Sequence, residues 1–206
     1  MAELEFDPSV EVEDIGVSVK EGIVTLNGSV GSYAERLAAA RAAKRLAGVR
    51  GLAEDIVVKL PDSSRLTDSD IAAAAVNAIK AITTVPQDTV KITVHDGWLT
   101  LEGTVDGWHQ KSAAEEAMRN LAGVKDVTNL IAIKPKVAAL DIKGAIKAAF
   151  DRHALLGVQK IQVETNGGEV VLRGAVRNFY EREEAERAAW AARGVTSVEN
   201  RIVLII

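Results

Sequence analysis

The chain has 206 residues, of which 48% are hydrophobic and 26% are charged, and its formal net charge is −4. This balance is typical of a folded protein and excludes an intrinsically disordered one. The sequence contains no cysteine, which excludes disulfide bonds, thiolate zinc sites and thiol nucleophiles. No segment is strongly basic, so we do not expect a general nucleic-acid binder, which needs a basic patch to neutralise phosphates.

The first ten residues are acidic and mixed in character. They contain no basic segment followed by an apolar run, as a secretory signal requires. Apolar runs elsewhere, such as Ile202 to Ile206, are far shorter than a membrane-spanning helix. We therefore expect a cytoplasmic protein without a membrane span.

The first part of the chain predicts a small unit of strands and one helix. In residues 15–30 apolar and polar side chains alternate, which indicates two strands joined by a turn near Gly22. Ser32 followed by Glu35 is a capping box that begins a helix, and Gly48 is the glycine that ends it. A last strand follows, and a strand, helix, strand connection of this length predicts a parallel crossover.

The same unit occurs three times. The copies are offset by 75 and then 71 residues, and their glycines keep one mutual spacing: Gly22, Gly28 and Gly48; Gly97, Gly103 and Gly123; Gly168, Gly174 and Gly194. A repeat of this length predicts an array of small modules. The predicted domains are residues 1–62, 66–135 and 137–206, and the second and third begin with an amphipathic helix, at 69–82 and 138–151.

The expected fold class is α+β, with three tandem αββαβ modules, each a three-stranded mixed sheet packed on helices. The first module lacks the N-terminal helix of the other two. An uncovered face of four apolar side chains would forfeit at most about 6 to 12 kcal/mol, which is comparable to the stability of a small domain. We therefore hypothesise that a neighbouring module or a second chain covers this face.

Each copy carries the pattern V-x-V-x-x-G-x-V-x-L-x-G-x-V, followed by an alanine-rich helix that ends in Gly-Val. The matching segments are "VSVKEGIVTLNGSV", "ITVHDGWLTLEGTV" and "VETNGGEVVLRGAV", with "LAGV", "LAGV" and "ARGV" at the helix ends. This pattern resembles the BON domain over nearly the whole chain. The missing first helix of copy one is the departure from it.

The resemblance implies a binding protein, since BON domains are associated with three roles. These are phospholipid or membrane-surface binding, protection against osmotic stress in periplasmic proteins with two copies, and potassium sensing in a cytoplasmic relative that adds a LysM domain. The chain shows no LysM segment and no export signal, which weakens the transfer of the last two roles.

No residue pattern points to catalysis, to a cofactor or to a metal. The histidines are not at ligand spacing from one another: His95, His109 and His153. The acidic pairs fall on predicted helices, where a charged outer face is expected: Glu115 with Glu116, and Glu183 with Glu184. The copies share only core and turn positions, which leaves no repeated polar cluster to serve as an active site, and an enzyme is not expected.

Aromatic residues are the candidate binding positions. Tyr33, Trp108 and Phe179 occupy one repeat position at the first turn of a helix. They are either structural plugs over the hairpin end or rings displayed to a lipid headgroup or a protein partner.

Four further residues are candidates for surface binding. Trp98 is expected on the outer sheet face, and Trp190 on the outward side of a helix, although both could pack between modules. Arg173 and Arg177 belong to the more basic third copy and would meet an anionic lipid.

The leading hypothesis is a non-enzymatic protein that binds a phospholipid membrane surface or an envelope-associated partner under stress. The alternative is a protein adaptor, or a scaffold that self-associates through the uncovered sheet of copy one. The third hypothesis is potassium-type ion sensing.

Overall fold

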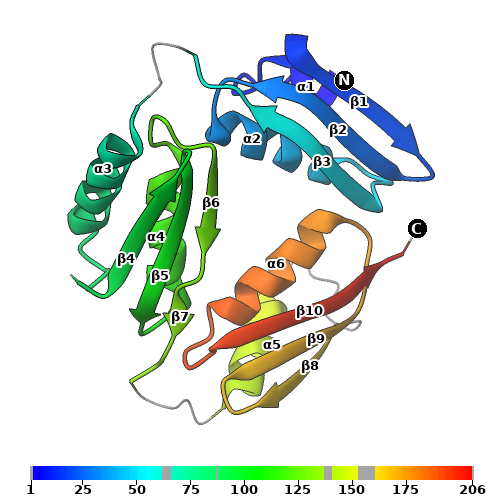
Figure 1. The fold of residues 1–206 in the computed structure, drawn as a ribbon. Coiled ribbons are helices and arrows are strands. Elements are labelled where there is room, and N and C mark those ends of the chain that lie inside the picture. The colour runs from blue at the N-terminus through cyan, green and yellow to red at the C-terminus, as the bar shows by residue number, and fades with distance from the viewer. Residues whose placement is uncertain (1, 62–65, 87, 137–140, 153–160, 206) are drawn as a thin grey trace.

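The computed structural model describes residues 2–61, 66–86, 88–136, 141–152 and 161–205 (Figure 1). Module 1 contains α1 (Ala2–Glu5), a 3-10 turn (Val12–Asp14), β1 (Ile15–Lys20), β2 (Ile23–Val30), α2 (Tyr33–Arg45) and β3 (Gly51–Val58). Module 2 contains α3 (Asp68–Ala81), β4 (Val90–His95), β5 (Trp98–Val105), α4 (Trp108–Arg119), β6 (Asp126–Asn129) and β7 (Ala132–Ile133). Module 3 contains α5 (Ile142–Arg152), β8 (Ile161–Asn166), β9 (Glu169–Val176), α6 (Phe179–Trp190) and β10 (Ser197–Leu204). The predicted α+β class with tandem modules is confirmed.

Each sheet has the same topology. Its middle strand pairs antiparallel with the strand before it and parallel with the strand after the crossover helix. The parallel partner lies 28 positions further along the chain in all three modules: Ile23 with Gly51, Trp98 with Asp126, and Glu169 with Ser197. In module 2 the short β7 keeps this register against β5, so β6 and β7 together fill the place of one strand.

Two of the repeated glycines are required by the backbone, one in the hairpin turn and one where the middle strand closely approaches the preceding segment. At the hairpin of module 2, Asp96 and Gly97 both have positive φ values, of 51° and 80°, as a two-residue type I′ turn requires. At Gly103, φ is 136° and a Cβ atom would overlap the carbonyl oxygen of Thr89 on the neighbouring chain segment. Only glycine meets both conditions there.

The predicted helix starts are present. The side-chain oxygens of Ser32 and Asn178 accept hydrogen bonds from the amides of Glu35 and Glu181, at 3.2 and 2.8 Å. In a capping box the Glu35 carboxylate would accept from the amide of the N-cap residue, Ser32. Here it accepts from the amide of the preceding residue, Gly31, at 2.8 Å.

Each module has its own apolar core between the sheet and its helices. The repeat leucines Leu26, Leu101 and Leu172 are fully buried at its centre. In modules 2 and 3 the first helix contributes to this core through Ile71 and Ile146, both of which are buried. The periodic apolar residues of the sequence therefore mark the inward faces.

Module 1 has one turn of helix, α1, where the other modules have a long first helix. Leu4 of α1 and Val10 are buried in the core of this module. The hypothesis that a neighbouring module or a second chain covers this face is therefore wrong for the part nearest α1. The chain's own leading segment lies there, and its single turn is too short to show a helical period in the sequence.

The three modules surround one centre, with the third strand of each sheet (β3, β6 and β10) towards it (Figure 1). Tyr33 at the start of α2 packs into the core of module 2, and Trp108 at the start of α4 stacks on Trp190 at the end of α6. Phe179 at the start of α6 packs against the core of module 1. Each module therefore contacts the next through the first turn of its crossover helix, and the third module contacts the first, which closes the ring.

Candidate functional site

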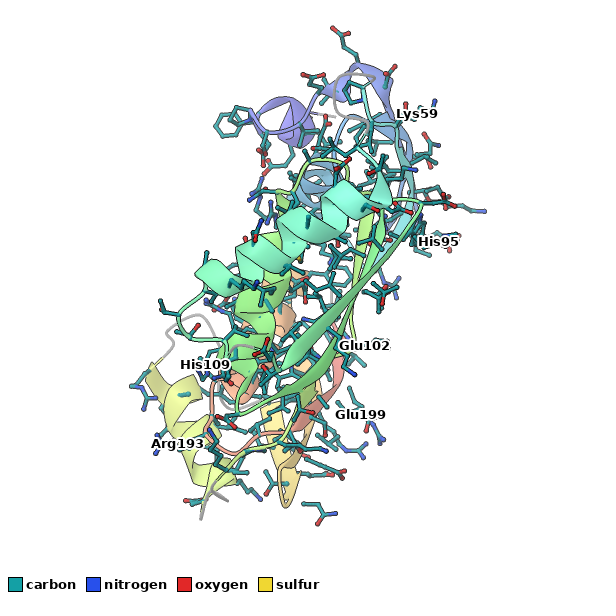
Figure 2. All side chains as sticks on the ribbon, turned by 60° about the vertical axis from the view of Figure 1, so that its left-hand side comes forward. Lys59, His95, Glu102, His109, Arg193 and Glu199 are labelled. Carbon is teal, nitrogen blue, oxygen red and sulfur yellow. The ribbon has the colours of Figure 1, made fainter. Side chains whose placement is uncertain are left out.

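The outer sheet faces, which point away from the helices, carry the most exposed of the candidate aromatic rings. Trp98 begins β5 and is 56% exposed, on the face predicted for it. Leu130, which follows β6, is also exposed. Figure 2 shows Glu102 and Glu199, from the outer faces of modules 2 and 3, on one side of the molecule, and His109 and Arg193 on the opposite side. The outer faces of these two sheets thus point to the same side of the molecule in the view of Figure 2.

Charges of both signs are paired on the outer face of module 3. The guanidinium of Arg173 lies 3.2 Å from Glu164, and Arg201 donates two hydrogen bonds to Glu199, at 2.6 and 2.8 Å. Arg201 lowers the pKa of the Glu199 carboxyl below its ordinary value. Arg173, a candidate anion-binding residue, is therefore paired with an acidic neighbour, which the sequence could not show because the partner lies on another strand. Arg177 is exposed, and its backbone amide donates to Glu181 at 2.9 Å.

Tyr33 lies in the seam between modules 1 and 2 and is only 7% exposed. The guanidinium of Arg36 lies 6.0 Å from the centre of its ring and forms an ion pair with Asp126 of module 2, at 3.2 Å. Burial raises the pKa of the Tyr33 phenol, and the carboxylates of Asp126 and Glu115 raise it further. This ring is a plug between modules and is not displayed to a partner.

Trp108 and Trp190 form the seam between modules 2 and 3. Their rings stack with centroids 6.3 Å apart and planes 17° from parallel, a favourable geometry for an aromatic pair. They line a hollow of about 560 Å³ with residues of both modules, including His109 and Arg193. The outward lipid-facing role considered for Trp190 does not agree with this packing, which follows the alternative of packing between modules.

Phe179 is half-buried in the third seam, against the core of module 1. Lys44 at the end of α2 lies 3.2 Å from Glu183 of α6 across the same seam. The three rings at the shared repeat position thus serve one purpose, which is to join successive modules. Trp98 is left as the candidate aromatic on an open surface.

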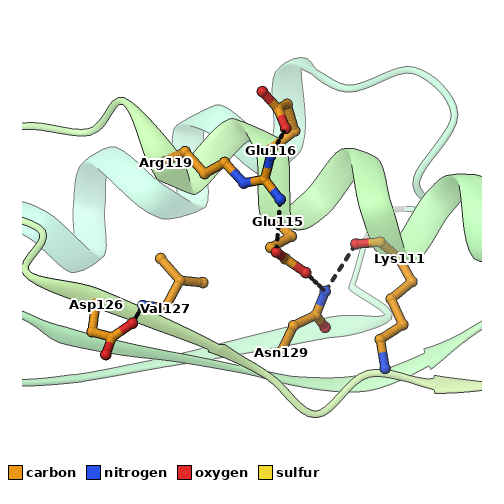
Figure 3. A network of polar contacts seen from close by, with 7 residues as sticks. All are labelled: Lys111, Glu115, Glu116, Arg119, Asp126, Val127 and Asn129. Carbon is orange, nitrogen blue, oxygen red and sulfur yellow. Dashed lines mark hydrogen bonds and ion pairs between the residues drawn. The ribbon is translucent and has the colours of Figure 1, made fainter. Parts of the chain in front are cut away.

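A polar network joins the crossover helix of module 2 to its last strand (Figure 3). The side-chain amide of Asn129 donates to the carbonyl oxygen of Lys111 at 3.0 Å and to Glu115 at 3.2 Å, and its oxygen accepts from Ile131 N at 3.2 Å. Glu115 also accepts from Arg119 at 3.0 Å. Glu115 therefore faces the strand. The sequence predicted a solvated helix face for this residue, and its hydrogen bonds to Asn129 and Arg119 show that this is only partly true.

Module 3 repeats this network. Asn200 donates to the carbonyl oxygen of Arg182 at 3.2 Å and to Glu186 at 2.9 Å. The prediction that the copies share only core and turn positions is therefore wrong for modules 2 and 3, whereas Ala40 and Glu54 stand at the network positions in module 1. The recurrence of asparagine and glutamate at an offset of 71 residues was the signal that could have revealed it. The network fixes the helix to the sheet in both modules.

Among the residues that the structure describes, no group of three or more histidine, aspartate or glutamate side chains could hold a metal ion. His95 and His109 are exposed, and His153 lies outside the described residues. In the described part of the chain, no helix is long and apolar enough to span a bilayer.

Comparison with known proteins agrees with the repeat. The BON domain model matches residues 1–59, 67–135 and 139–205. The osmotically-inducible protein Y of Escherichia coli (strain K12) is 31% identical over 125 residues, which cover 59% of this chain and 62% of that protein. The match thus spans less than two thirds of the relative's own length.

Two solved structures align along most of the chain without a close superposition. One is CdsD, a structural protein of the type III secretion system of Chlamydia trachomatis, at 14% identity and a TM-score of 0.27, covering 99% of this chain and 89% of that one. The other is the C-terminal domain of CdsD, at 13% identity and a TM-score of 0.26, covering 94% and 91%. These scores carry no argument about the fold. The family is shown by the three matches to the BON domain model, which together cover most of the chain. The chain belongs to the BON domain family, with three BON domains in tandem.

Proposed function

We propose that this chain is a non-enzymatic protein of the osmotic-stress response that binds a phospholipid surface through the outer faces of its sheets. The observation that carries the proposal is Trp98, whose indole is largely exposed on the outer face of the module 2 sheet, while the other candidate rings pack between modules. The similarity to an osmotically inducible protein supports the link to stress.

The chemistry of this surface favours insertion of a ring over attraction by charge. An indole ring prefers the headgroup level of a bilayer, where its apolar body and its N–H are both satisfied. The outer face of module 3 pairs its arginines with glutamates, and the whole chain is acidic. Attraction to anionic lipid is therefore weak, and added salt is expected to change binding little.

Co-sedimentation of the full chain with vesicles tests the proposal. The vesicles are phosphatidylcholine alone or with phosphatidylglycerol, each at low and high salt. Trp98→Glu is the informative variant, because Glu169 holds the same repeat position in module 3 and a glutamate is compatible with the fold. We expect about a tenfold weaker binding of both vesicle types, from the apolar contact that the ring loses.

Val76→Glu is the matched control, since Val76 is an exposed apolar residue on α3 and lies on a helix outside the sheet surface. It should bind vesicles as the unchanged chain does. Equal binding by Trp98→Glu would refute the sheet surface as the contact, and no binding to either vesicle type would refute the membrane role.

A protein-adaptor function is the second candidate. It is favoured by module 1, whose short first helix leaves apolar side chains such as Val19 and Leu46 exposed. Potassium-type ion sensing stays a prediction, and its test is a shift in melting temperature that occurs with potassium and is absent with sodium at equal ionic strength.

A further inference from the structure

One end of module 1 has an empty place that is filled in module 2. A Cβ atom added at Gly123 would lie 2.8 Å from the Cδ1 atom of Ile71 and 3.3 Å from Leu66, because the start of α3 lies there. At Gly48, the same repeat position in module 1, no atom of the described residues lies within 4 Å of the added Cβ.

Two apolar side chains border this empty place. Val19 is 67% exposed and Leu46 is 39% exposed. Their counterparts in module 2, Val94 and Leu121, are half-buried against the core of that module. We call the surface formed by Val19, Leu46 and Gly48 the notch.

The short helix α1 does not reach the notch. Leu4 is buried and Arg45 holds Glu3 and Asp7 at 3.5 and 3.1 Å, so α1 is fixed along α2. Phe6, which follows α1, is almost fully exposed. The leading segment therefore covers one part of the face that a long first helix would cover and leaves the other part open.

In module 2, helix α3 fills this place, and hydrogen bonds and charges hold its first turn there. The carboxylate of Asp68, in the first turn of α3, accepts hydrogen bonds from the hairpin amides of Asp96 and Gly97, at 2.8 and 3.0 Å. These bonds lower the pKa of Asp68, and the nearby charges of His95 and Lys125 lower it further.

The corresponding positions in module 1 are better suited to an acidic group. The hairpin amides belong to Glu21 and Gly22, and no described side chain accepts from them as Asp68 does in module 2. Lys20 stands in place of the histidine, and Arg50 in place of the lysine, with its side chain against Gly22. Two permanent cations therefore flank the site where the occupant's carboxylate would lie.

We propose that the notch of module 1 binds an amphipathic helix of a partner protein, one with a carboxylate in its first turn and an apolar stripe like that of α3. Such a helix would complete module 1 as α3 completes module 2, in the helix-in-groove manner of recognition. In α3 the apolar stripe is formed by Ile71, Ala75 and Ile79, all buried, and the carboxylate lies three residues before it. This inference concerns protein binding and is independent of vesicle binding through Trp98.

The test uses the full chain and a synthetic peptide of residues 66–82, the segment that fills the equivalent place in module 2. Amide shifts in ¹⁵N-labelled chain are followed during titration with the peptide. We expect saturable shifts at the notch and its hairpin, at residues 19–22 and 46–50. Leu46→Glu in the chain should weaken binding about tenfold or more, because it places a carboxylate where an apolar contact is required.

Matched controls distinguish binding at the notch from nonspecific binding of the peptide. Leu130→Glu, at an exposed apolar position in module 2, should leave the affinity for the peptide within about twofold of its original value, as is usual for a surface change away from a contact. A peptide with Ile71→Glu should fail to bind, and one with Asp68→Lys should bind several-fold more weakly, since it would face Lys20 and Arg50.

Three results would overturn the proposal. The first is no shift at millimolar peptide, and the second is shifts confined to module 2, which would mean that the peptide replaces α3. The third is self-association of the chain without peptide that shifts the same amides and is lost in Leu46→Glu. That result would make a second copy of the chain the occupant.

Discussion

Truncation of Tyr33 to alanine probes whether the modules are held together by buried rings. A tyrosine buries about 150 to 250 Å², and only 7% of Tyr33 is exposed. At about 25 cal/mol per Å² the ring contributes at most about 4 to 6 kcal/mol. Because the alanine keeps part of this area and the seam can close partly around it, we expect a loss of about 3 kcal/mol in the free energy of unfolding.

Urea denaturation followed by circular dichroism measures this loss. A change of about 3 kcal/mol should lower the unfolding midpoint by about 1 M or more, given the usual dependence of stability on urea. Tyr33→Phe is the control, since it keeps the ring and removes a hydroxyl whose pKa burial already raises; it should cost less than about 1 kcal/mol. If the alanine and phenylalanine variants unfolded within about 0.5 kcal/mol of each other, the ring would not be a buried contact between modules.

Three further perturbations follow from the structure. Gly103→Ala should destabilise the chain by about 2 kcal/mol or more, measured by urea denaturation, because its φ is 136° and the added methyl overlaps the carbonyl of Thr89; a neutral result would contradict the tight approach. Asp68→Asn should lower the free energy of unfolding of the chain at neutral pH, because the carboxylate accepts two backbone hydrogen bonds. Since the folded pKa of Asp68 is lowered, its contribution is present above the ordinary value of 3.8 and is lost as the pH falls through the folded value, so the variant and the original chain should converge in acid melting curves. Trp190→Ala should remove the near-ultraviolet dichroism of the stacked pair with Trp108 and cost about 2 kcal/mol; an unchanged spectrum would show that the rings do not stack in solution.

Much of each module could be predicted from the sequence. The alternation around Gly97 predicts the hairpin, and the structure places a type I′ turn there. The recurrence of Gly103 at one repeat position marks a backbone contact that no side chain permits. These features are local, because a turn and the strands beside it depend on residues close together in the chain.

The polar network of modules 2 and 3 was within reach of the same reasoning. Asn129 and Asn200 occupy one repeat position, and so do Glu115 and Glu186. A repeated polar pair on facing elements indicates a hydrogen bond, whereas Glu115 read alone on a helix indicates only a charged surface. Comparison of polar positions between copies would have predicted the bond.

The sequence by itself determined the number of modules, their internal topology and the glycines that shape them, since apolar period and glycine spacing report contacts within about 50 residues of chain. Only the tertiary structure decided where the aromatic rings lie. Arg36 and Asp126 meet across 90 residues, and Phe179 reaches the core of module 1. The aromatic rings that join the modules stand at helix ends, outside the apolar stripe of each helix, and would be surface residues of an isolated module. Their burial is a property of the closed ring.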